Sequence, residues 1–374
     1  MNVPQLDLKQ QYSAIKPELD AAVARVLDSG YFIMGPEVQA FEQEVARHCG
    51  VPHAIGVASG TDALLLSLRA LGVGPGDKVL LPSFTFFATA GAVCNVGATP
   101  VFVDIDPQTY NIDPQALAHR LQRDPELQSQ AKAILPVHLY GQMADMEAIG
   151  SVAQEFGLFV VEDAAQAIGA TRHGQQAGTL GDTGCFSFFP SKNLGACGDG
   201  GMIITHDEAL AEKLRVLRVH GSKPKYYHSM VGYNSRLDAL QAAILRVKLT
   251  HLERWSSERR EKATAYNERF ANVEAIGTPS AAQGNTHIYH QYTVRTEQRD
   301  ALAAHLKAQG IGNSVYYPLP LHLQACFADL GYHEGGLPHT ELACQQVLSL
   351  PMFPELTTEQ IETVVEAVTQ FVQG

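Results

Sequence analysis

The sequence is poor in the residue patterns that mark disulfide-stabilised and zinc-binding proteins. Its 374 residues include only six cysteines, and no two of them form a C-x-x-C pair. These spacings fit neither a disulfide framework nor the common zinc sites. The fifteen histidines contain no H-x-x-x-H or H-x-x-E-H pair that would place two ligands on one helical face. We therefore expect reduced thiols and no metal site.

Long apolar runs and clusters of basic residues are also missing. The net charge is −12, and acidic and basic residues are interspersed, which excludes a basic stripe for nucleic acid and a polybasic patch for a membrane. The apolar runs are far shorter than a bilayer requires, and the polar segment Met1 to Leu8 does not resemble a signal peptide. We expect a cytoplasmic protein with no nucleic-acid partner and no membrane partner.

What the sequence does contain is a regular alternation of strand-like and helix-like segments between residues 53 and 205. This alternation is typical of βα units around a mostly parallel sheet. Helices are expected at 61–70 and 145–156. Several of the predicted strands are nearly continuous apolar runs, as buried parallel strands are; the seven predicted strands are Ala54–Ala58, Lys78–Pro82, Pro100–Val103, Ala133–Val137, Leu158–Glu162, Cys185–Phe188 and Gly201–Thr205.

The chain is long enough for two domains, and 45% of its residues are hydrophobic. Apolar residues at mostly three- and four-residue spacings predict a long helix over 235–252 that leads out of the first domain. The remainder predicts a smaller α/β unit with elements at 289–294, 299–309, 312–317 and 358–372. We therefore predict a large domain over 1–250 and a small domain over 251–374.

In doubly wound sheets, ligands bind at the carboxyl ends of the strands. The first predicted strand is followed by Ser59-Gly60-Thr61-Asp62, which opens a helix. Glycine allows close approach of the backbone, and the free N–H groups of a helix N-terminus attract phosphate. An ordinary helix N-cap explains the same residues equally well, because Ser, Thr and Asp all cap helices.

Two further strand ends carry ionisable residues. Asp163 follows the strand over 158–162 and is suited to pair with a protonated pyridine nitrogen, although such an aspartate also serves as a cap or metal ligand. Lys192 follows the strand over 185–188 and precedes a glycine-rich loop at 195–201. Burial lowers the pKa of a lysine and makes its neutral amine available for imine chemistry. A surface charge is the alternative for Lys192.

Six motifs, in the same order along the chain, resemble the DegT/DnrJ/EryC1/StrS sugar aminotransferases, which are fold-type I pyridoxal-phosphate enzymes. The resemblance covers essentially the whole chain, from residue 4 to the segment around 322. It implies an α/β fold with three α/β/α layers, a mostly parallel seven-stranded sheet and a smaller C-terminal α/β domain. The motifs are Ser59-Gly60-Thr61, Pro82 to Phe86, Pro136 to Gly141, Glu162 to Gln166, Phe186 to Asn193 and Gly232 to Asp238.

The resemblance also implies a role for each motif residue toward pyridoxal 5′-phosphate. Phe86 would stack on the cofactor ring, and plain core packing is its alternative. Asn234 would reach the phosphate of the neighbouring subunit, which implies a homodimer with shared sites. The other implied roles are the Schiff-base lysine for Lys192, the pyridine-nitrogen partner for Asp163, the ring-hydroxyl partner for Gln166, and phosphate contacts for Gly60, Thr61 and Ser187.

By the same resemblance, the amino donor is L-glutamate, pyridoxamine 5′-phosphate is the intermediate form of the cofactor, and the acceptor is a nucleotide-linked keto-sugar. The segments 220–222, 226–228 and 234–238 resemble enzymes that aminate C3, which favours a dTDP- or UDP-linked 3-keto hexose over a 4-keto sugar. Candidate substrate contacts are His220, Tyr226, Tyr227, Arg236, Tyr317 and His322. For Arg236 a salt bridge is the alternative, and for the others a structural hydrogen bond or aromatic packing.

Three rival functions share this fold. A sugar dehydratase of this family would carry histidine in place of Lys192. A cysteine desulfurase would need an activated thiolate, for which Cys326 is the only loop-like candidate and lacks activating neighbours in the sequence. A non-catalytic regulatory protein that binds pyridoxal phosphate is the third rival, and an intact Lys192 and Asp163 argue against it.

Overall fold

The large part of the protein is built on a seven-stranded sheet. The computed structural model describes residues 1–373. The strands lie in the order β1-β9-β8-β5-β4-β2-β3, and only β9 runs antiparallel to its neighbours. Their bounds are β1 His53–Val57, β2 Lys78–Pro82, β3 Thr99–Val103, β4 Ala131–Ile134, β5 Phe159–Asp163, β8 Thr183–Ser187 and β9 Gly201–Thr205. Each predicted strand corresponds to one of these seven, which confirms the predicted mostly parallel sheet.

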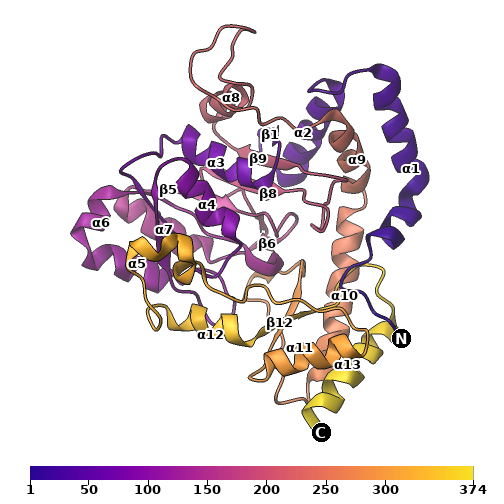
Figure 1. The fold of residues 1–374 in the computed structure, drawn as a ribbon. Helices are drawn as coiled ribbons and strands as arrows, with labels where there is room; N and C mark the ends of the chain where they lie inside the picture. The colour runs from indigo at the N-terminus through magenta and orange to yellow at the C-terminus, as the bar shows by residue number, and fades with distance from the viewer. Residues whose placement is uncertain (374) are drawn as a thin grey trace.

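Helices cover both faces of the sheet and make three layers (Figure 1). Successive side chains of a strand point to opposite faces. In β2, Leu80 accordingly packs into one core cluster, while Val79 and Leu81 pack into the other. The first cluster is covered by α1 Leu8–Ser29, α2 Pro36–Cys49, α5 Pro114–Arg123, α6 Pro125–Gln130, α7 Met146–Phe156 and α9 Ala239–Leu249, and the second by α3 Gly60–Ala70, α4 Phe87–Asn95 and α8 Glu208–Leu217.

A smaller unit with its own core lies at the lower right of Figure 1. The helix predicted over 235–252 is α9, which is shorter than predicted and ends at Leu249, and the separate helix α10 begins at Leu252. The element expected over 312–317 is only a single bridge between Ser314 and Ser349. The unit contains α10 Leu252–Phe270, β11 Tyr292–Arg295, α11 Arg299–Ala308, β12 Val347–Leu350 and α13 Thr358–Gln373.

The chain passes more than once between the two units. Val3 is buried in the core of the smaller unit, where it pairs with the backbone of Gly310 and Gly312. Conversely, Leu321 and Phe327 pack into the core beneath α3 and α4. The division into 1–250 and 251–374 therefore stays a prediction for the main bodies, with short segments of each packed on the other.

The connecting segments complete the fold. They contain the short helices η1 Leu139–Gly141, η2 Leu321–Leu323 and η3 Ala325–Leu330, the helix α12 Pro338–Gln346, and a three-stranded sheet of β6 Thr171–Arg172, β7 Gln175–Gln176 and β10 Asn285–Thr286. Among residues 1–373, no helix is both long enough and apolar enough to cross a bilayer.

Candidate active site

The carboxyl ends of β5 and β8 bring an acid and a base together. Asp163 is the last residue of β5 and is buried, while Lys192 lies in the turn that follows β8. Burial lowers the pKa of the Lys192 ammonium to about 8, and the nearby Asp163 carboxylate acts in the opposite direction. A neutral amine is therefore accessible near neutral pH, which is the form that attacks a carbonyl group.

Two hydrogen-bond donors hold the Asp163 carboxylate in place. The hydroxyl of Thr89 donates to Oδ2 at 2.9 Å, and the N–H of Ala165 donates to Oδ1 at 3.2 Å. Burial raises the pKa of the Asp163 carboxyl, and the hydrogen bond from Thr89 opposes that rise. Two oxygens offer about four lone pairs, so the carboxylate keeps capacity for a further donor.

The residue before Asp163 locks the end of the strand. Glu162 is fully buried, and its carboxylate is hydrogen-bonded on both oxygens. Because His138 Nδ1 accepts a hydrogen bond from the N–H of Ala144, the ring hydrogen of His138 is on Nε2. This Nε2–H donates a hydrogen bond to Glu162. The four donors to Glu162 are His138 Nε2 at 2.7 Å and the N–H groups of Gly178 at 2.8 Å, Leu180 at 2.6 Å and Gly181 at 2.6 Å.

The segment after β1 forms a tight cradle at the start of α3. Ser59 Oγ accepts the N–H of Asp62 at 3.1 Å, so the N-cap interpretation is correct. Within the described chain, the N–H groups of Gly60 and Thr61 have no hydrogen-bond partner. They lie at the N-terminus of α3, which is the positive end of the helix dipole. A Cβ atom on Gly60 would lie 2.6 Å from Ser187 Cβ. The cap and the predicted phosphate site are therefore compatible.

Gln166 presents an N–H donor into the same region. Its Oε1 accepts the backbone N–H of Tyr140 at 2.7 Å, and its Nε2 donates to the Tyr317 hydroxyl at 3.2 Å. Tyr140 adopts a left-handed backbone with φ of 59°, which a residue of this size rarely does. With Oε1 already used, the second hydrogen of Nε2 remains to meet an oxygen acceptor, as the predicted role at a ring hydroxyl requires.

Phe86 lies beside this group and is 58% exposed. That exposure argues against the core-packing alternative. Its ring lies 6.2 Å from the ring of Tyr317, measured between centroids. Burial and the nearby Asp163 carboxylate raise the pKa of Tyr317, and its hydrogen bond with Gln166 opposes them. Tyr317 is thus placed with the cofactor candidates, although the sequence singled it out only as a substrate contact.

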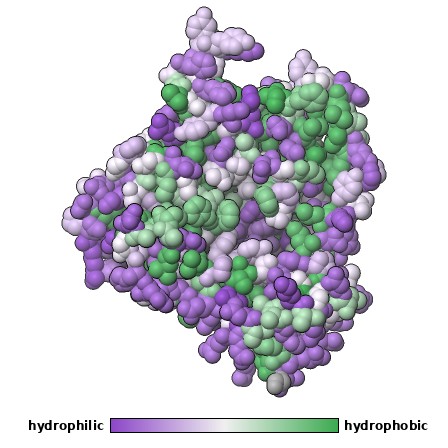
Figure 2. All heavy atoms as spheres, in the orientation of Figure 1, coloured by the Kyte–Doolittle hydropathy of each residue, from purple (hydrophilic) through white to green (hydrophobic). Residues whose placement is uncertain are grey.

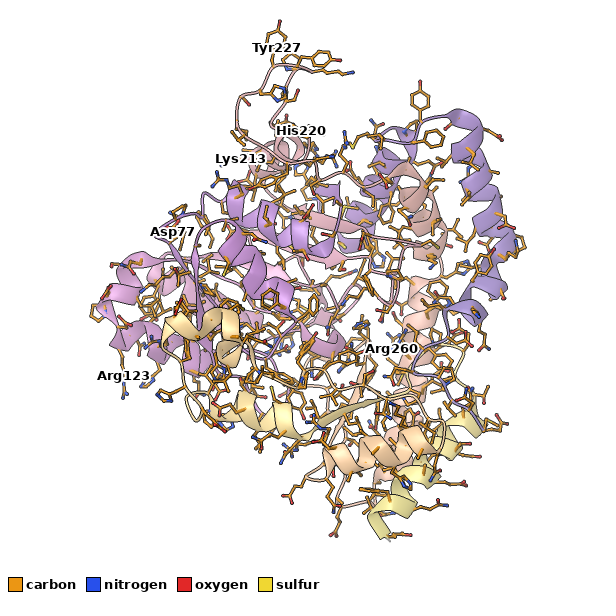
Figure 3. The ribbon with its side chains drawn as sticks, viewed as in Figure 1. Asp77, Arg123, Lys213, His220, Tyr227 and Arg260 are labelled. Atoms are coloured by element: carbon orange, nitrogen blue, oxygen red, sulfur yellow. The ribbon has the colours of Figure 1, made fainter. Side chains whose placement is uncertain are left out.

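The remaining predicted residues lie elsewhere. His220 and Tyr227 mark the base and the tip of a loop that projects from the body, and Tyr226 beside the tip is 80% exposed (Figure 3). Asn234 and Arg236 line a polar pocket with Gly198 and Gln241, which Ala58, just before the cradle, also lines. Within residues 1–373, no salt bridge of Arg236 is found.

His322 is buried rather than open to a substrate. Its Nδ1 lies 2.7 Å from Ser83 Oγ, and its Nε2 lies 3.2 Å from Glu341 Oε1. Both ring nitrogens are therefore engaged within the protein, which favours the structural alternative for this residue. The hydrogen bond between His322 and Ser83 holds η2 against the end of β2.

Three residues in contact with the candidate site were not singled out from the sequence: Thr89, Tyr140 and His290. Thr85 and Thr89 are four residues apart at the start of a helix that follows a strand, and this spacing is a signal that could have found them. The role of Tyr140 depends on a backbone N–H, and the role of His290 on a contact with Asn193 at 3.0 Å. Neither has a signature in the sequence.

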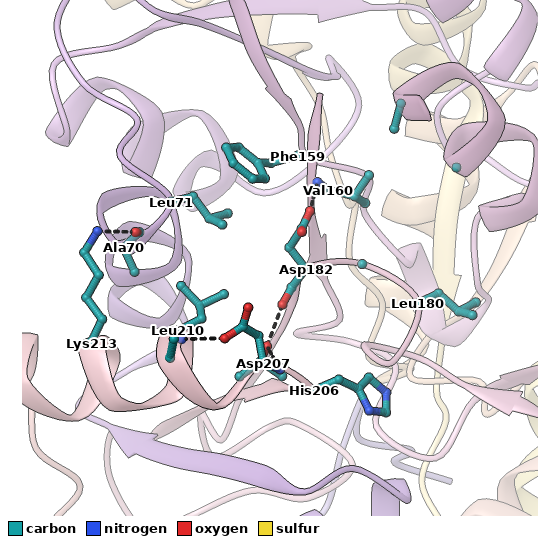
Figure 4. Close-up of a pocket in the computed structure, with 15 residues that line it drawn as sticks. Ala70, Leu71, Phe159, Val160, Leu180, Asp182, His206, Asp207, Leu210 and Lys213 are labelled. Atoms are coloured by element: carbon teal, nitrogen blue, oxygen red, sulfur yellow. Dashed lines mark hydrogen bonds between the residues drawn. The ribbon is translucent and has the colours of Figure 1, made fainter. Parts of the chain in front are cut away.

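A pocket of about 620 Å³ lies at the opposite edge of the sheet (Figure 4). It is lined where β5 begins at Phe159 and where α3 ends at Ala70. Its charged groups already have partners: Lys213 Nζ donates to the Ala70 carbonyl at 2.6 Å, and Asp207 Oδ1 caps α8 through the N–H of Leu210. Because this pocket lies at the amino-terminal ends of the parallel strands and its charged groups are already paired, it is not part of the candidate active site.

Comparison with known proteins decides the family. The DegT/DnrJ/EryC1/StrS aminotransferase family matches residues 13–369. This chain belongs to that family. The predicted family and the pyridoxal-phosphate cofactor are thereby confirmed, and the protein is an aminotransferase by membership.

Individual relatives cover almost the whole chain. A protein of Geobacillus stearothermophilus described as a pleiotropic regulatory protein is 55% identical over 99% of both chains. A UDP-N-acetyl-3-dehydro-alpha-D-glucosamine 3-aminotransferase of Acidithiobacillus ferrooxidans is 47% identical over 100% of this chain and 98% of its own. The crystal structure of S. venezuelae DesV in complex with a ketimine intermediate matches with a TM-score of 0.96, 46% identity, and coverage of 100% and 99%.

Proposed function

We propose that this member of the family transfers the amino group of L-glutamate to C3 of a nucleotide-linked 3-keto hexose. The observation that carries the proposal is the Lys192 amine, with a pKa of about 8, beside the buried Asp163 carboxylate. The C3 position is supported by the resemblance of the segments 220–222, 226–228 and 234–238 and by the 3-aminotransferase among the relatives. Amination at C4 of a 4-keto sugar nucleotide is the alternative.

The residues present fit pyridoxal phosphate. Only glycine fits at position 60, because an added Cβ would collide with Ser187 Cβ. The backbone N–H groups at the amino end of α3 are free to bind a phosphate. Gln166 offers an N–H for the ring hydroxyl, and Asp163 keeps lone pairs for the ring nitrogen. When bound, the cofactor withdraws electrons from the carbon atom that loses its proton.

Within this arrangement, Lys192 has two tasks. Its neutral amine would hold the cofactor covalently, and the amine, once displaced by the donor, would accept the proton of the donor α-carbon. The pKa near 8 suits both tasks, because a general base works best when its pKa is close to the working pH. Asp163 holds the ring nitrogen in its protonated state by opposite charge.

We also propose that the complete site requires two copies of this chain. Asn234 is exposed and lines a polar pocket together with Gly198 and with Ala58, which precedes the cradle at Gly60. Apolar side chains are exposed nearby: Figure 2 shows green atoms gathered along α1, where Leu27 is 56% exposed, and Tyr31 just after this helix is 65% exposed. An apolar surface of this kind marks an interface, and a second copy would bring its Asn234 to the phosphate cradle.

The substrate test is turnover against a matched panel of 3-keto and 4-keto sugar nucleotides with L-glutamate as donor. We expect transfer to a 3-keto sugar linked to UDP or dTDP. Transfer only to 4-keto sugars would replace the C3 proposal by its alternative. No transfer to any keto-sugar, with the cofactor bound, would overturn the substrate class.

The shared site is tested by mixing two inactive variants. Lys192→Ala lacks the amine, and Asn234→Ala lacks the predicted phosphate contact. A mixed dimer in which each site draws Lys192 from one chain and Asn234 from the other regains one intact site, so activity returns on mixing. No recovery, with mixed dimers demonstrated by native mass spectrometry, would contradict the sharing of the site.

A regulatory role is the second candidate, because the relative at 55% identity is described as a regulatory protein. L-glutamate distinguishes the two functions. An aminotransferase converts its cofactor to the pyridoxamine form, and the visible absorbance of the protein fades when the donor is added. A protein that binds the cofactor and keeps its colour with every amino donor would favour the regulatory function. We also propose a cytoplasmic location, which cell fractionation tests.

A further inference from the structure

Two threonines outside the predicted set form a chain of hydroxyl groups that ends on Asp163. Thr89 lies on the first turn of α4 and is buried, and Thr85 precedes that helix and is buried as well. Thr89 Oγ1 lies 2.9 Å from Asp163 Oδ2, and Thr85 Oγ1 lies 3.0 Å from Thr89 Oγ1. The contact joins residues 74 positions apart in the sequence.

The direction of both hydrogen bonds follows from the number of hydrogens. An ionised carboxylate only accepts, so the single hydroxyl hydrogen of Thr89 points to Asp163. Thr89 then has only lone pairs left for Thr85, and the hydrogen between them belongs to Thr85. The chain therefore runs in one direction, Thr85 to Thr89 to Asp163, and its negative end is the carboxylate.

This chain opposes the effect of burial on Asp163. Burial favours the neutral carboxylic acid, whereas a hydroxyl that donates to the carboxylate favours the charged form. The other groups that face Asp163 do not replace the hydroxyl. The N–H of Ala165, Lys192 and His138 also favour the charged form, but Ala165 donates to the other oxygen, Oδ1, and His138 is bound to Glu162. Cys185 and Tyr317 also lie near the carboxylate, and burial raises the pKa of each.

We propose that Thr89, aligned by Thr85, is a positioning residue that keeps Asp163 ionised and thereby keeps the shared proton on the ring nitrogen of the cofactor. The inference rests on the proposed function, because it requires Asp163 to face that nitrogen. Without the hydroxyl, the proton moves toward the carboxylate. A hydrogen bond to a charged group contributes about 1.5–3 kcal/mol, so the equilibrium between the two proton positions shifts about ten- to hundredfold.

The position of the proton is measured directly by nitrogen NMR. The protein is loaded with pyridoxal phosphate labelled with ¹⁵N in the ring, and the chemical shift is recorded at neutral pH. We expect Thr89→Val to move the resonance from the protonated toward the unprotonated value, and Thr89→Ser to leave it in place. Thr85→Val should move it less in the same direction, and it also serves as the reporter if Thr89→Val does not fold.

A matched control separates this role from general stability. Thr205 is buried, and its Oγ1 donates to the carbonyl of Asp182 at 2.8 Å beside the pocket at the opposite edge of the sheet. Thr205→Val removes that hydroxyl and should leave the ¹⁵N shift unchanged.

Asp163→Asn separates the inference from the proposed function. A resonance that moves in Asp163→Asn and stays in place in Thr89→Val would overturn the hydroxyl chain alone. A resonance that stays in place in Asp163→Asn would overturn the role of Asp163, and the inference with it.

Discussion

His290 Nδ1 lies 3.0 Å from Asn193 Oδ1, and Asn193 Nδ2 donates to the carbonyl of Ile288 at 3.3 Å. The second bond fixes the orientation of the amide, so His290 carries its hydrogen on Nδ1. Burial, together with the charges of Lys192 and Arg259, lowers the pKa of His290 well below its usual range and keeps the ring neutral. Asn193, the residue after Lys192, is thus held by two residues of one segment, Ile288 and His290.

Removing this amide should loosen the turn that carries Lys192. Asn193→Ala leaves the His290 ring and the Ile288 carbonyl buried without partners, and we expect a loss of about 2–4 kcal/mol in the free energy of unfolding. Urea denaturation of the cofactor-free protein measures it. Asn272 is exposed, and Asn272→Ala should change the stability by less than about 0.5 kcal/mol. Equal effects of the two substitutions would contradict the anchoring role.

The lowered pKa of Lys192 predicts a stability that rises with pH. Between pH 8, the folded-state value, and the ordinary value of 10.5, the unfolded chain binds a proton that the folded protein does not. The free energy of unfolding of the cofactor-free protein therefore increases across this window. Lys192→Met removes the titrating group, so the difference between wild type and variant should increase from pH 8 to 10.5. A difference that is flat or falls with pH would show that the amine is not buried as described.

Gln166→Glu tests the donor at the ring hydroxyl. The carboxylate still accepts the N–H of Tyr140 but offers no hydrogen, and its charge repels a ring oxygen that carries negative charge. We expect the dissociation constant of pyridoxal phosphate to rise about tenfold or more. Gln128→Glu on exposed α6 makes the same change of charge away from the site and should leave the dissociation constant unchanged. Unchanged binding in Gln166→Glu would exclude the proposed contact.

A pair of glycines tests the phosphate cradle. In Gly60→Ala the new Cβ would lie 2.6 Å from Ser187 Cβ and 3.1 Å from its Cα, and such overpacking costs about 1–3 kcal/mol. Gly150 lies within α7, and no atom lies within 4 Å of the place that a Cβ would occupy, so Gly150→Ala should stabilise the helix by about 0.5–1 kcal/mol. Thermal unfolding and cofactor affinity are measured for both. Normal affinity in Gly60→Ala would remove Gly60 from the cradle.

The sheet was predictable because its strands are local features. The apolar runs at 78–82 and 201–205 match β2 and β9 residue for residue, and the other strands differ by a few positions. The antiparallel direction of β9 was not predicted, since an apolar run carries no direction. The candidate site was predictable where motifs end strands, as at Asp163. The spacing of Thr85 and Thr89 marks the pair, but the contacts that Thr89 and His290 make depend on the packing of distant segments, which no local pattern encodes.

The first residues of the chain complete a unit made mainly of the last ones. Val3 is buried against the backbone of Gly310 and Gly312. During synthesis, Val3 must therefore wait until Gly310 and Gly312 have been made before it finds its partners. The sheet that carries Asp163 and Lys192 has all its strands by Thr205 and faces no such delay. The smaller unit is therefore completed only when Val3 binds the segment at Gly310 and Gly312. A bulky tag placed directly before Val3 would hinder this last step.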